Sequence, residues 1–582
     1  MEKNVVAIRE AAARENVHLT LESGQVLSGP IGEKLETYLQ QAKELGWITS
    51  QAPLIAAVVD GKLRELTYPI NQDVTVRPVT LKESDGGRIY RRSLVLLMTT
   101  AVDELWSGTQ VNVNYAVYDG GFFCEVVNRD PLTDSDIAEL EQKMCDIVAE
   151  DNPIGKRMVS LEEARQLFAQ RGDNDKVRLL EARTRDNLTL YSLRERDDYY
   201  FGYMVPSTRY LQTFRLMKVD GGFILQYPRR ETPTELHDLH LHEKLHTVFH
   251  QADDWLAKLQ IEDIGRLNHL VRHNRIDEII LVAEALHEQN VAAIAAQIRQ
   301  QHENGVRIIL IAGPSSAGKT TFSKRLAIQL LANGLRPYTI EMDNYFVDRE
   351  RTPRDENGDY DFESLYALDR EKLNQHLLHL MAGERVQLPK FSFQLGKSEP
   401  GRWAQLLDRQ IVILEGIHGM NPELLPELPT SSVFRVYVSV MSQLNIDSHN
   451  RIPTTDVRLL RRLVRDARSR GYNAIDTLSR WQSVRRGEKR NIFPYQENAD
   501  VMFNSALPYE LAALRSLAEP LLLQVPTSTP PHIEANRLLS FLRWVEPLTP
   551  QQTTMIPDTS LLREFIGGSI LDSYHPSEAG EE

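Results

Sequence analysis

The sequence predicts an α/β protein of several domains, in which a parallel sheet with helices on both faces follows smaller β-rich and α+β modules. Three observations support this prediction. A buried apolar run at 308–312 leads into a glycine loop and then a helical pattern. The apolar runs at 336–343 and 410–415 also end in acidic residues, as strands do at the ligand edge of a parallel sheet. Residues 17–80 instead look like a small β-rich module, in which 17–21 alternate polar and apolar residues as half-buried strands do.

The bulk composition excludes several classes of protein. A chain of 582 residues can hold several domains, each with its own core. The formal net charge of −14 argues against general nucleic-acid binding and against an anionic membrane surface. Two cysteines, Cys124 and Cys145, cannot make a disulfide framework, which favours a reducing compartment. Without a secretory leader or a run of eighteen apolar residues, we expect a cytoplasmic protein with no membrane span.

Residues 1–83 form the first predicted domain. Residues 17–21 alternate, a turn follows, and a helical pattern covers 31–45. Residues 55–59 read as a strand before the hairpin turn at Asp60 and Gly61, and 74–79 as a later strand. This order indicates a ubiquitin-like β-grasp roll. It resembles the TGS domain at the start of threonyl-tRNA synthetases.

Residues 84–230 form the second predicted domain, an α+β module. Short stretches at 91–93, 101–106, 121–126 and 214–218 resemble the second additional (editing) domain of threonyl-tRNA synthetases. That family carries two pairs of metal-binding or catalytic side chains, one His pair and one Cys–His pair.

The four positions of those pairs carry other residues here. They are Leu96, Thr100, Tyr200 and Met204. None is a competent zinc ligand, so we expect the editing chemistry to be lost. Two interpretations stay open: a cleft that still binds a ligand, tRNA-like or other, through Tyr200, Tyr203 and Arg209, or an inherited scaffold with packed aromatic rings.

Residues 231–303 form a predicted helical connector. Thr234 can cap a helix that runs to about residue 259, and two further helices are expected at 276–287 and 290–301. Within a histidine cluster at 237–250, His242, His246 and His250 fall on one helical face. That face is either a metal site or an ordinary solvated surface.

The central motif lies at the start of the fourth predicted domain, residues 304–525. Residues 313–320 fit the pattern G-x-x-x-x-G-K-[ST] between a strand and a helix. Such a loop points its N–H groups at phosphate oxygens, and the helix adds its positive end. Lys319 would bridge the outer phosphates and Thr320 would bind Mg²⁺. The predicted ATP-binding residues are Gly313, Pro314, Ser315, Ser316, Ala317, Gly318, Lys319, Thr320 and Thr321.

The same domain resembles the uridine kinase and phosphoribulokinase group of P-loop kinases. Besides the loop, the matching pieces are Met-Asp-Asn-Tyr-Phe at 342–346, Tyr-Asp-Phe at 360–362, Leu-Pro-x-Phe-x-Phe at 388–393, Ile-Leu-Glu-Gly-Ile at 413–417 and Arg-Arg-Leu-Val-Arg-Asp-Ala at 461–467. The resemblance implies ATP-dependent phosphoryl transfer to a small hydroxyl acceptor.

The resemblance also implies residue roles. Asp343 would be the catalytic base, with Lys319 and Arg465 as further catalytic residues, and Glu415 would join Thr320 at Mg²⁺. The arginines of 458–470 would lie on a lid helix. The implied substrate-binding residues are Tyr345, Tyr360, Asp361, Phe391, Phe393, Arg461, Arg462 and Arg468. The plainer alternatives are a helix cap for Asp343, a structural carboxylate for Glu415 and a solvated face for several arginines.

One family feature is missing, because Gly396 stands where uridine kinases carry a base-reading histidine. The acceptor is therefore either a nucleoside 5′-hydroxyl, as in uridine kinases, or another polyol or sugar phosphate. A different class of function is a nucleotide-switched regulatory protein whose N-terminal module binds tRNA or the ribosome. A homo-oligomer is compatible with each reading.

Residues 526–582 form a C-terminal helix and tail. Prolines at 526, 530 and 531 end the preceding pattern, and a helix is expected at 533–544. Residues 561–566 are apolar enough to dock on another part of the protein.

Overall fold

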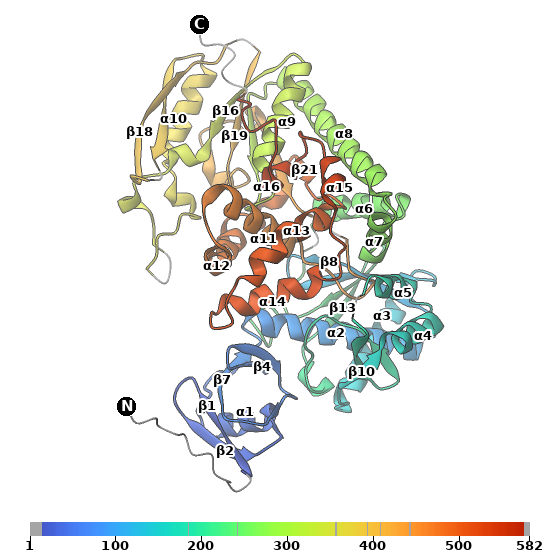
Figure 1. The fold of residues 1–582 in the computed structure, drawn as a ribbon. Coiled ribbons are helices and arrows are strands. Elements are labelled where there is room, and N and C mark those ends of the chain that lie inside the picture. The colour runs from blue at the N-terminus through green and yellow to red at the C-terminus, as the bar shows by residue number, and fades with distance from the viewer. Residues whose placement is uncertain are drawn as a thin grey trace, which may run out of the picture. The chain divides into compact units, whose positions relative to one another are not determined.

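The computed structural model describes residues 14–183, 185–240, 242–354, 358–392, 394–407, 409–441 and 444–575 (Figure 1). They form two compact units. The first takes its described residues from Met1–Gln166, Arg185–Leu239 and Thr527–Ile533. The second takes them from Leu167–Thr184, His240–Pro526 and Glu534–Glu582. The two units therefore interleave along the sequence.

The first unit begins with a five-stranded mixed sheet in the order β2-β1-β7-β4-β5. The central strand β7 pairs in parallel with β1 and antiparallel with β4. Apolar residues of these strands pack with helix α1 around a small core. The elements are β1 (Asn16–Leu21), β2 (Val26–Pro30), β3 (Glu33–Lys34), α1 (Leu35–Glu44), β4 (Leu54–Val59), β5 (Lys62–Glu65), β6 (Pro69–Ile70) and β7 (Val74–Thr80).

The rest of the first unit is built on the long helix α2 (Ser84–Leu105). Most of its residues from Leu94 to Val102 are buried in a core shared with two antiparallel sheets. The sheet orders are β13-β14-β9-β8 and β10-β11-β12. The other elements are β8 (Gln110–Val117), β9 (Gly121–Val127), α3 (Asp134–Ala149), β10 (Gly155–Ser160), α4 (Leu161–Arg171), β11 (Asn187–Leu193), β12 (Arg196–Asp198), β13 (Arg215–Val219) and β14 (Gly222–Gln226).

The second unit contains a five-stranded sheet in the order β16-β19-β15-β20-β21. All four neighbouring pairs are parallel, so the carboxyl ends of the strands meet at one edge. The central strand β15 (Ile308–Ala312) is entirely buried, as the apolar run predicts. The other strands are β16 (Arg336–Glu341), β19 (Gln410–Glu415), β20 (Val433–Ser439) and β21 (Val501–Asn504).

Helices cover both faces of this sheet. Ile308 and Leu310 belong to a core that includes Leu373 and Leu377 of α10 (Arg370–Met381). Because successive residues of a strand point to opposite faces, Ile309 and Ile311 face the other side. There α9 (Lys319–Ala332) packs on the strands and α8 (Ile276–Glu303) packs on α9.

Further helices and one hairpin complete the second unit. The hairpin consists of β17 (Val386–Ser392) and β18 (Lys397–Ala404). The helices are α5 (Asn174–Glu181), α6 (Glu243–Lys258), α7 (Ile264–Arg272), α11 (Thr454–Arg465), η7 (Asp466–Arg470), α12 (Ala474–Asn491), α13 (Glu510–Leu523), α14 (Pro531–Leu542), α15 (Pro550–Thr554) and α16 (Arg563–Ile566).

Two helical predictions for the connector are wrong in extent. The helix expected from Thr234 starts only at Glu243, and the two helices expected within 276–301 are the single helix α8. The two residues between the expected helices, Glu288 and Gln289, belong to α8. One of them, Glu288, forms an ion pair with Arg325 of α9 at 2.7 Å between Oε2 and Nη2, so the polar interruption marks a contact between helices.

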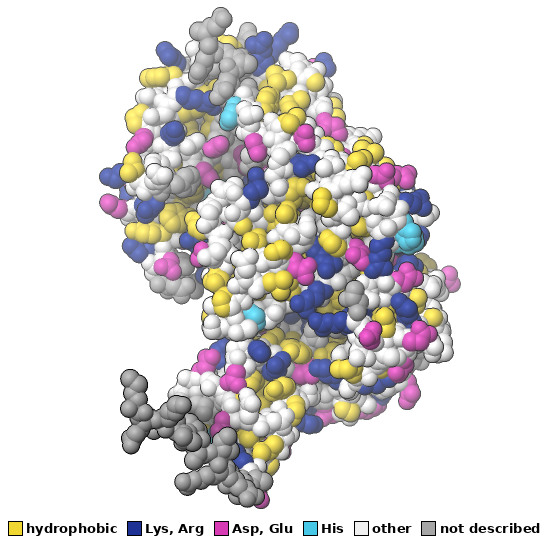
Figure 2. Space-filling view, viewed as in Figure 1, with side chains coloured by type: hydrophobic (Ala, Val, Ile, Leu, Met, Phe, Trp, Pro, Cys, Tyr) yellow, Lys and Arg dark blue, Asp and Glu magenta, His cyan; other side chains and the backbone are white. Residues whose placement is uncertain are grey.

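Among the described residues, α8 is the one helix whose length and composition would permit a membrane crossing. Core helices of water-soluble proteins pass the same test, so this is weak evidence. Side chains along α8, including Ile280, Val291 and Ile298, are fully buried within the protein. On the face seen in Figure 2, acidic and basic side chains intermingle over most of the surface.

Candidate functional site at the glycine loop

The glycine loop leaves the end of β15 and leads into α9. A Cβ added to Gly313 would lie 1.8 Å from the Val438 carbonyl oxygen, so the loop passes too close to β20 for any side chain. Gly318 is the N-cap residue of α9, with φ near +87°. That left-handed conformation is easy for glycine and strained for other residues. The two motif glycines thus set the path of the loop.

A buried ion pair holds the loop from behind. Arg458 of α11 and Glu488 of α12 make two hydrogen bonds with each other, one of them 2.9 Å between Nη2 and Oε2. Their side chains are 2% and 1% exposed. Glu488 accepts the Ser315 N–H at 3.2 Å, and Arg458 donates to the Ser315 carbonyl at 3.0 Å. The pair therefore fixes both backbone polar groups of one loop residue.

Three charged groups converge at the carboxyl ends of the strands. Lys319, the first residue of α9, donates to the Pro314 carbonyl at 3.2 Å. The Thr320 hydroxyl donates to the Glu415 carboxylate, at the end of β19, at 3.0 Å. Asp343 lies just beyond β16, in the short helix η2 (Met342–Tyr345).

The pKa values of the two carboxyl groups reflect this crowding. Burial is the main cause that raises the pKa of Glu415 to about 7, against the opposing charge of Lys319. Burial also raises the pKa of Asp343, again opposed by Lys319. The Asp343 side chain is nevertheless open to water. A group that protein surrounds but water still reaches is recessed within the site.

The acceptor-side residues have unequal surroundings. Asp361 is half-buried and lies 3.5 Å from Arg490, and Tyr360 carries the Arg354 guanidinium over its ring. Phe391 is buried against Phe346, with 5.6 Å between ring centroids. Phe393 lies outside the described residues.

Tyr345 is packed in the core of the second unit. It is 1% exposed, and its hydroxyl lies 3.1 Å from Nδ1 of His376 on α10. This places the ring in the core beneath the site, so we do not retain Tyr345 as a substrate-binding residue.

The arginines of α11 and of the following helix η7 are held by protein contacts. Arg461 is fully buried, paired at 2.6 Å with Glu510 of α13, and also donates to the Ser505 carbonyl. It cannot bind substrate from there. Arg462 donates to the Ser315 hydroxyl at 2.9 Å, which does place its guanidinium on the loop. Arg468 donates to the carbonyl of Glu564 at 2.9 Å. We therefore replace the expected lid helix by a packed helix that supports the loop.

Sequence reasoning missed Glu363, which lies among the charged groups of the site. Burial raises its pKa to about 7, and the charges of Glu488, Arg462, Lys319 and Asp343 also act on it. Its backbone is anchored, because Asn491 donates to its carbonyl at 2.6 Å and its N–H donates to Asp361. A Cβ at Gly487 would lie 2.5 Å from the Glu363 Cβ, so α12 needs a glycine there. The acidic residue directly after Tyr-Asp-Phe was the available signal.

Arg349 lies beside Gly396, the position at which uridine kinases carry the histidine. A Cβ added to Gly396 would lie 2.9 Å from Nε of Arg349. The Arg349 N–H donates to the Gly396 carbonyl at 2.8 Å, so the two residues are held together. An arginine thus stands beside the position where a base reader was expected.

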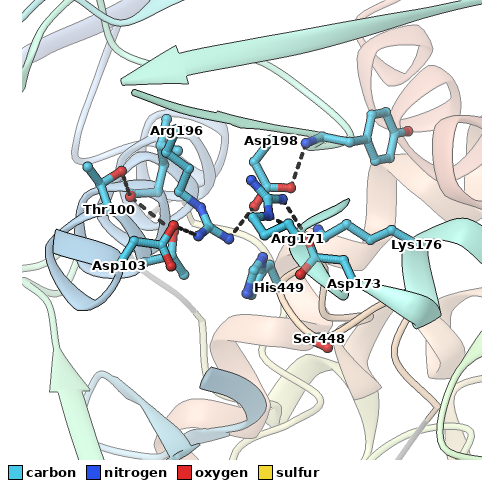
Figure 3. Close-up of polar contacts among 12 residues, drawn as sticks. Thr100, Asp103, Arg171, Asp173, Lys176, Arg196, Asp198, Ser448 and His449 are labelled. Carbon is cyan, nitrogen blue, oxygen red and sulfur yellow. Dashed lines mark hydrogen bonds and ion pairs between the residues drawn. The ribbon is translucent and has the colours of Figure 1, made fainter. Parts of the chain in front are cut away.

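The four positions of the first unit at which the synthetase family carries its His pair and its Cys–His pair are buried in the core. Leu96, Thr100, Tyr200 and Met204 are all at most 3% exposed, and the Thr100 hydroxyl donates to the Leu96 carbonyl at 2.8 Å. Figure 3 shows Arg196 between Asp103 and Asp198, with which it forms ion pairs.

Two residues proposed for a cleft in that unit are occupied by protein contacts. Arg209 pairs with Glu36 at 2.7 Å, and the Tyr203 hydroxyl accepts from Arg64 at 3.2 Å. Within the described residues no group of three metal-ligating side chains forms, in either unit.

Comparison with known proteins bears on both halves of the chain. Residues 308–511 match the model of the Phosphoribulokinase / Uridine kinase family. The threonine–tRNA ligase of Xanthomonas euvesicatoria pv. vesicatoria (strain 85-10) is 32% identical over 187 residues, which are 32% of this chain and 29% of that protein. The chain thus spans about three-tenths of this relative. Both resemblances noted in the sequence are confirmed at this level.

Two solved structures are similar to parts of the chain. One, described as a possible uridine kinase from Bacillus stearothermophilus, is 22% identical with a TM-score of 0.23, covering 34% of this chain and 89% of that one. The other, the D-glycerate 3-kinase of Cryptococcus neoformans var. grubii, is 15% identical with a TM-score of 0.20, covering 44% and 87%. Likeness at this level says nothing about the acceptor.

Proposed function

Since residues 308–511 match the Phosphoribulokinase / Uridine kinase family, we propose that the chain is an ATP-dependent kinase for a small hydroxyl acceptor. One observation carries the proposal: Lys319, the Thr320–Glu415 pair and Asp343 meet at the carboxyl ends of adjacent parallel strands. A phosphate-binding lysine, oxygen donors for a cation and a recessed carboxylate are the parts that phosphoryl transfer needs.

Each part has a role in the proposed reaction. The loop N–H groups and Lys319 hold the phosphates of ATP. Asp343 accepts the proton of the acceptor hydroxyl as that oxygen attacks the outer phosphorus, and ADP leaves with the bridging oxygen. The Arg462 guanidinium, on the Ser315 hydroxyl, is placed to balance charge on the transferred group.

The residues present suit Mg²⁺. The Thr320 hydroxyl and the Glu415 carboxylate are hard oxygen donors held within 3.0 Å of each other. Mg²⁺ supplies charge neutralisation at the phosphates when it is bound. These two residues would hold it, alongside the positive charges of Lys319 and Arg462.

A nucleoside 5′-hydroxyl is the first candidate acceptor, supported by Tyr360, Asp361 and Phe391 at the implied acceptor positions. A sugar phosphate or another anionic polyol is the second. It is favoured by Arg349, a cation where uridine kinases place a neutral base reader. A guanidinium binds a phosphate or carboxylate in two-pronged fashion, which a uracil ring cannot match.

The test measures ADP release with Mg²⁺ and ATP across a panel of nucleosides, sugars and sugar phosphates. We expect one acceptor class to stimulate ADP release, and Asp343→Asn to abolish the stimulation. Glu350→Gln is the control, because Glu350 is an exposed acid on the same stretch. Slow hydrolysis that no acceptor stimulates would instead support the nucleotide-switched regulatory protein. In that alternative the N-terminal module, which is similar to threonyl-tRNA synthetases, binds tRNA or the ribosome in the cytoplasm.

A further inference from the structure

The C-terminal segment docks on the glycine loop, outside the stretch that matches the kinase family. Leu561 is fully buried, and its Cδ2 lies 2.4 Å from where a Cβ on Gly318 would be. The next turn, α16, packs against α11. The sequence predicts only that this apolar stretch docks somewhere. The structure places it on the first turn of α9 (Figure 1).

Glu564 of α16 brings a carboxylate to that turn. Its Oε2 accepts from the Thr321 N–H at 3.3 Å and from the Thr321 hydroxyl at 3.0 Å. Thr321 is the third residue of α9, and such N–H groups lack partners within their own helix. In this motif they cradle the inner phosphates of the nucleotide, helped by the positive end of the helix. The carboxylate therefore lies where a nucleotide phosphate is expected.

The backbone of this segment is fixed. The Ser560 hydroxyl is fully buried and donates to Glu284 of α8. Arg468 donates to the carbonyls of Glu564 and Phe565. The apolar residues around Glu564 are fully buried: Leu561, Leu562 and Phe565. A phosphate can displace the carboxylate only by turning the Glu564 side chain, because withdrawing the segment would expose this core.

We propose that Glu564 is a nucleotide-site residue that competes with the α-phosphate for the Thr321 N–H, an inference that rests on the proposed binding of ATP at the loop. Two anions cannot share one donor at close range without repulsion. Arg465 can receive the displaced carboxylate, because its Nη1 already lies 3.8 Å from the other carboxylate oxygen. ATP and ADP both carry the α-phosphate, so Glu564 weakens both and speeds the release of ADP.

The test compares nucleotide affinity by titration calorimetry, using Mg·ADP and a non-hydrolysable Mg·ATP analogue on the full chain. Glu564→Gln keeps the size of the side chain and removes its charge. We expect this variant to bind both nucleotides at least tenfold more tightly than wild type. The control is Asp558→Asn, which removes a charge of the same segment that pairs with Arg563 at 3.8 Å. It should leave the affinity unchanged.

Further variants and outcomes keep the inference falsifiable. Glu564→Asp retains the charge but shortens the reach, so it should bind both nucleotides more tightly than wild type and less tightly than Glu564→Gln. If the Gln variant does not fold, tighter binding by Glu564→Asp than by wild type is the expected result. If Glu564→Gln or Glu564→Asp binds nucleotide no more tightly than wild type, the inference about Glu564 is overturned and the proposed function is not. Absence of nucleotide binding by wild type and every variant, with unchanged melting temperatures, overturns the proposed function and this inference with it.

Discussion

Removing one partner of the Arg458–Glu488 pair should destabilise the second unit severely. Both side chains are almost fully buried, and each also bonds the Ser315 backbone. Arg458→Met leaves the Glu488 carboxylate buried with Arg485, 3.8 Å away, as the remaining cation that the structure places beside it. Breaking a buried ion pair by removing one partner costs about 3–5 kcal/mol, and Arg485 at 3.8 Å is too far away to replace the two short hydrogen bonds from Arg458. The double variant Arg458→Met/Glu488→Leu removes both charges and should recover much of that loss.

The assay is denaturant unfolding followed by tryptophan fluorescence. Trp481 reports on the site directly, because the Arg458 guanidinium lies 5.6 Å from the centre of its ring. We expect each single variant to lose about 3–5 kcal/mol and the double variant to lose about half as much or less. The double variant should still bind ATP poorly, since Ser315 has lost both of its anchors. Single variants within about 1 kcal/mol of wild type would refute the reasoning.

Three other predictions follow from the site. Gly318→Ala should destabilise the protein by at least about 2 kcal/mol in thermal unfolding, because the added Cβ meets both a positive φ and the Leu561 side chain. Gly471 also has a positive φ but no atom within 4 Å of an added Cβ, so Gly471→Ala should cost about 1 kcal/mol. Equal losses would show that the Leu561 contact does not matter. Glu415→Gln should raise the Mg²⁺ concentration for half-maximal rate at least tenfold, and an unchanged Mg²⁺ titration would remove Glu415 from the metal site. The pKa of Glu363 is raised from 4.5 to about 7 in the folded chain. Between these two pH values the folded chain holds a proton that the unfolded chain releases, so the free energy of unfolding falls as the pH rises from about 4.5 to 7. Glu363→Gln has no such titration and therefore lacks this loss of stability. Because the side chain is partly open to solvent, we expect its stability relative to wild type to rise by only about 1–2 kcal/mol between pH 5 and pH 8, measured as a difference in melting temperature. A melting-temperature difference that does not change with pH would contradict this prediction.

Local patterns predicted the elements that carry the loop. The strand at 308–312 and the helix after the glycine loop, Lys319–Ala332, occur where the apolar patterns put them. The periodicity could not show that residues 276–301 form one helix, because the polar stretch in its middle reads as a break. Its meaning depends on Arg325, which lies on another helix.

The charged residues of the site show the same limit more clearly. A run of arginines is typical of a solvated or lid helix, yet Arg458 and Arg461 are buried because each pairs with a buried glutamate. These partners, Glu488 and Glu510, lie 30 and 49 residues away in the sequence, where the pattern around the arginines cannot indicate them. Glu564 reaches the loop from 243 residues away. Spacing rules act over a few turns of helix or one hairpin, so the acids that complete these pairs become visible only once the chain is folded.

The helix α5 has a consequence for how this protein can be divided. It is encoded amid the synthetase-like region, but Lys176 makes a fully buried ion pair with Asp447 at 3.2 Å, and Leu179 and Leu180 are buried with it. A recombinant fragment that starts after residue 230 would lack Lys176 and would leave the buried Asp447 carboxylate with its hydrogen bonds from Asn450 but without this cation. The chain therefore cannot be cut once at residue 230 without losing this contact, because α5 belongs to the second compact unit.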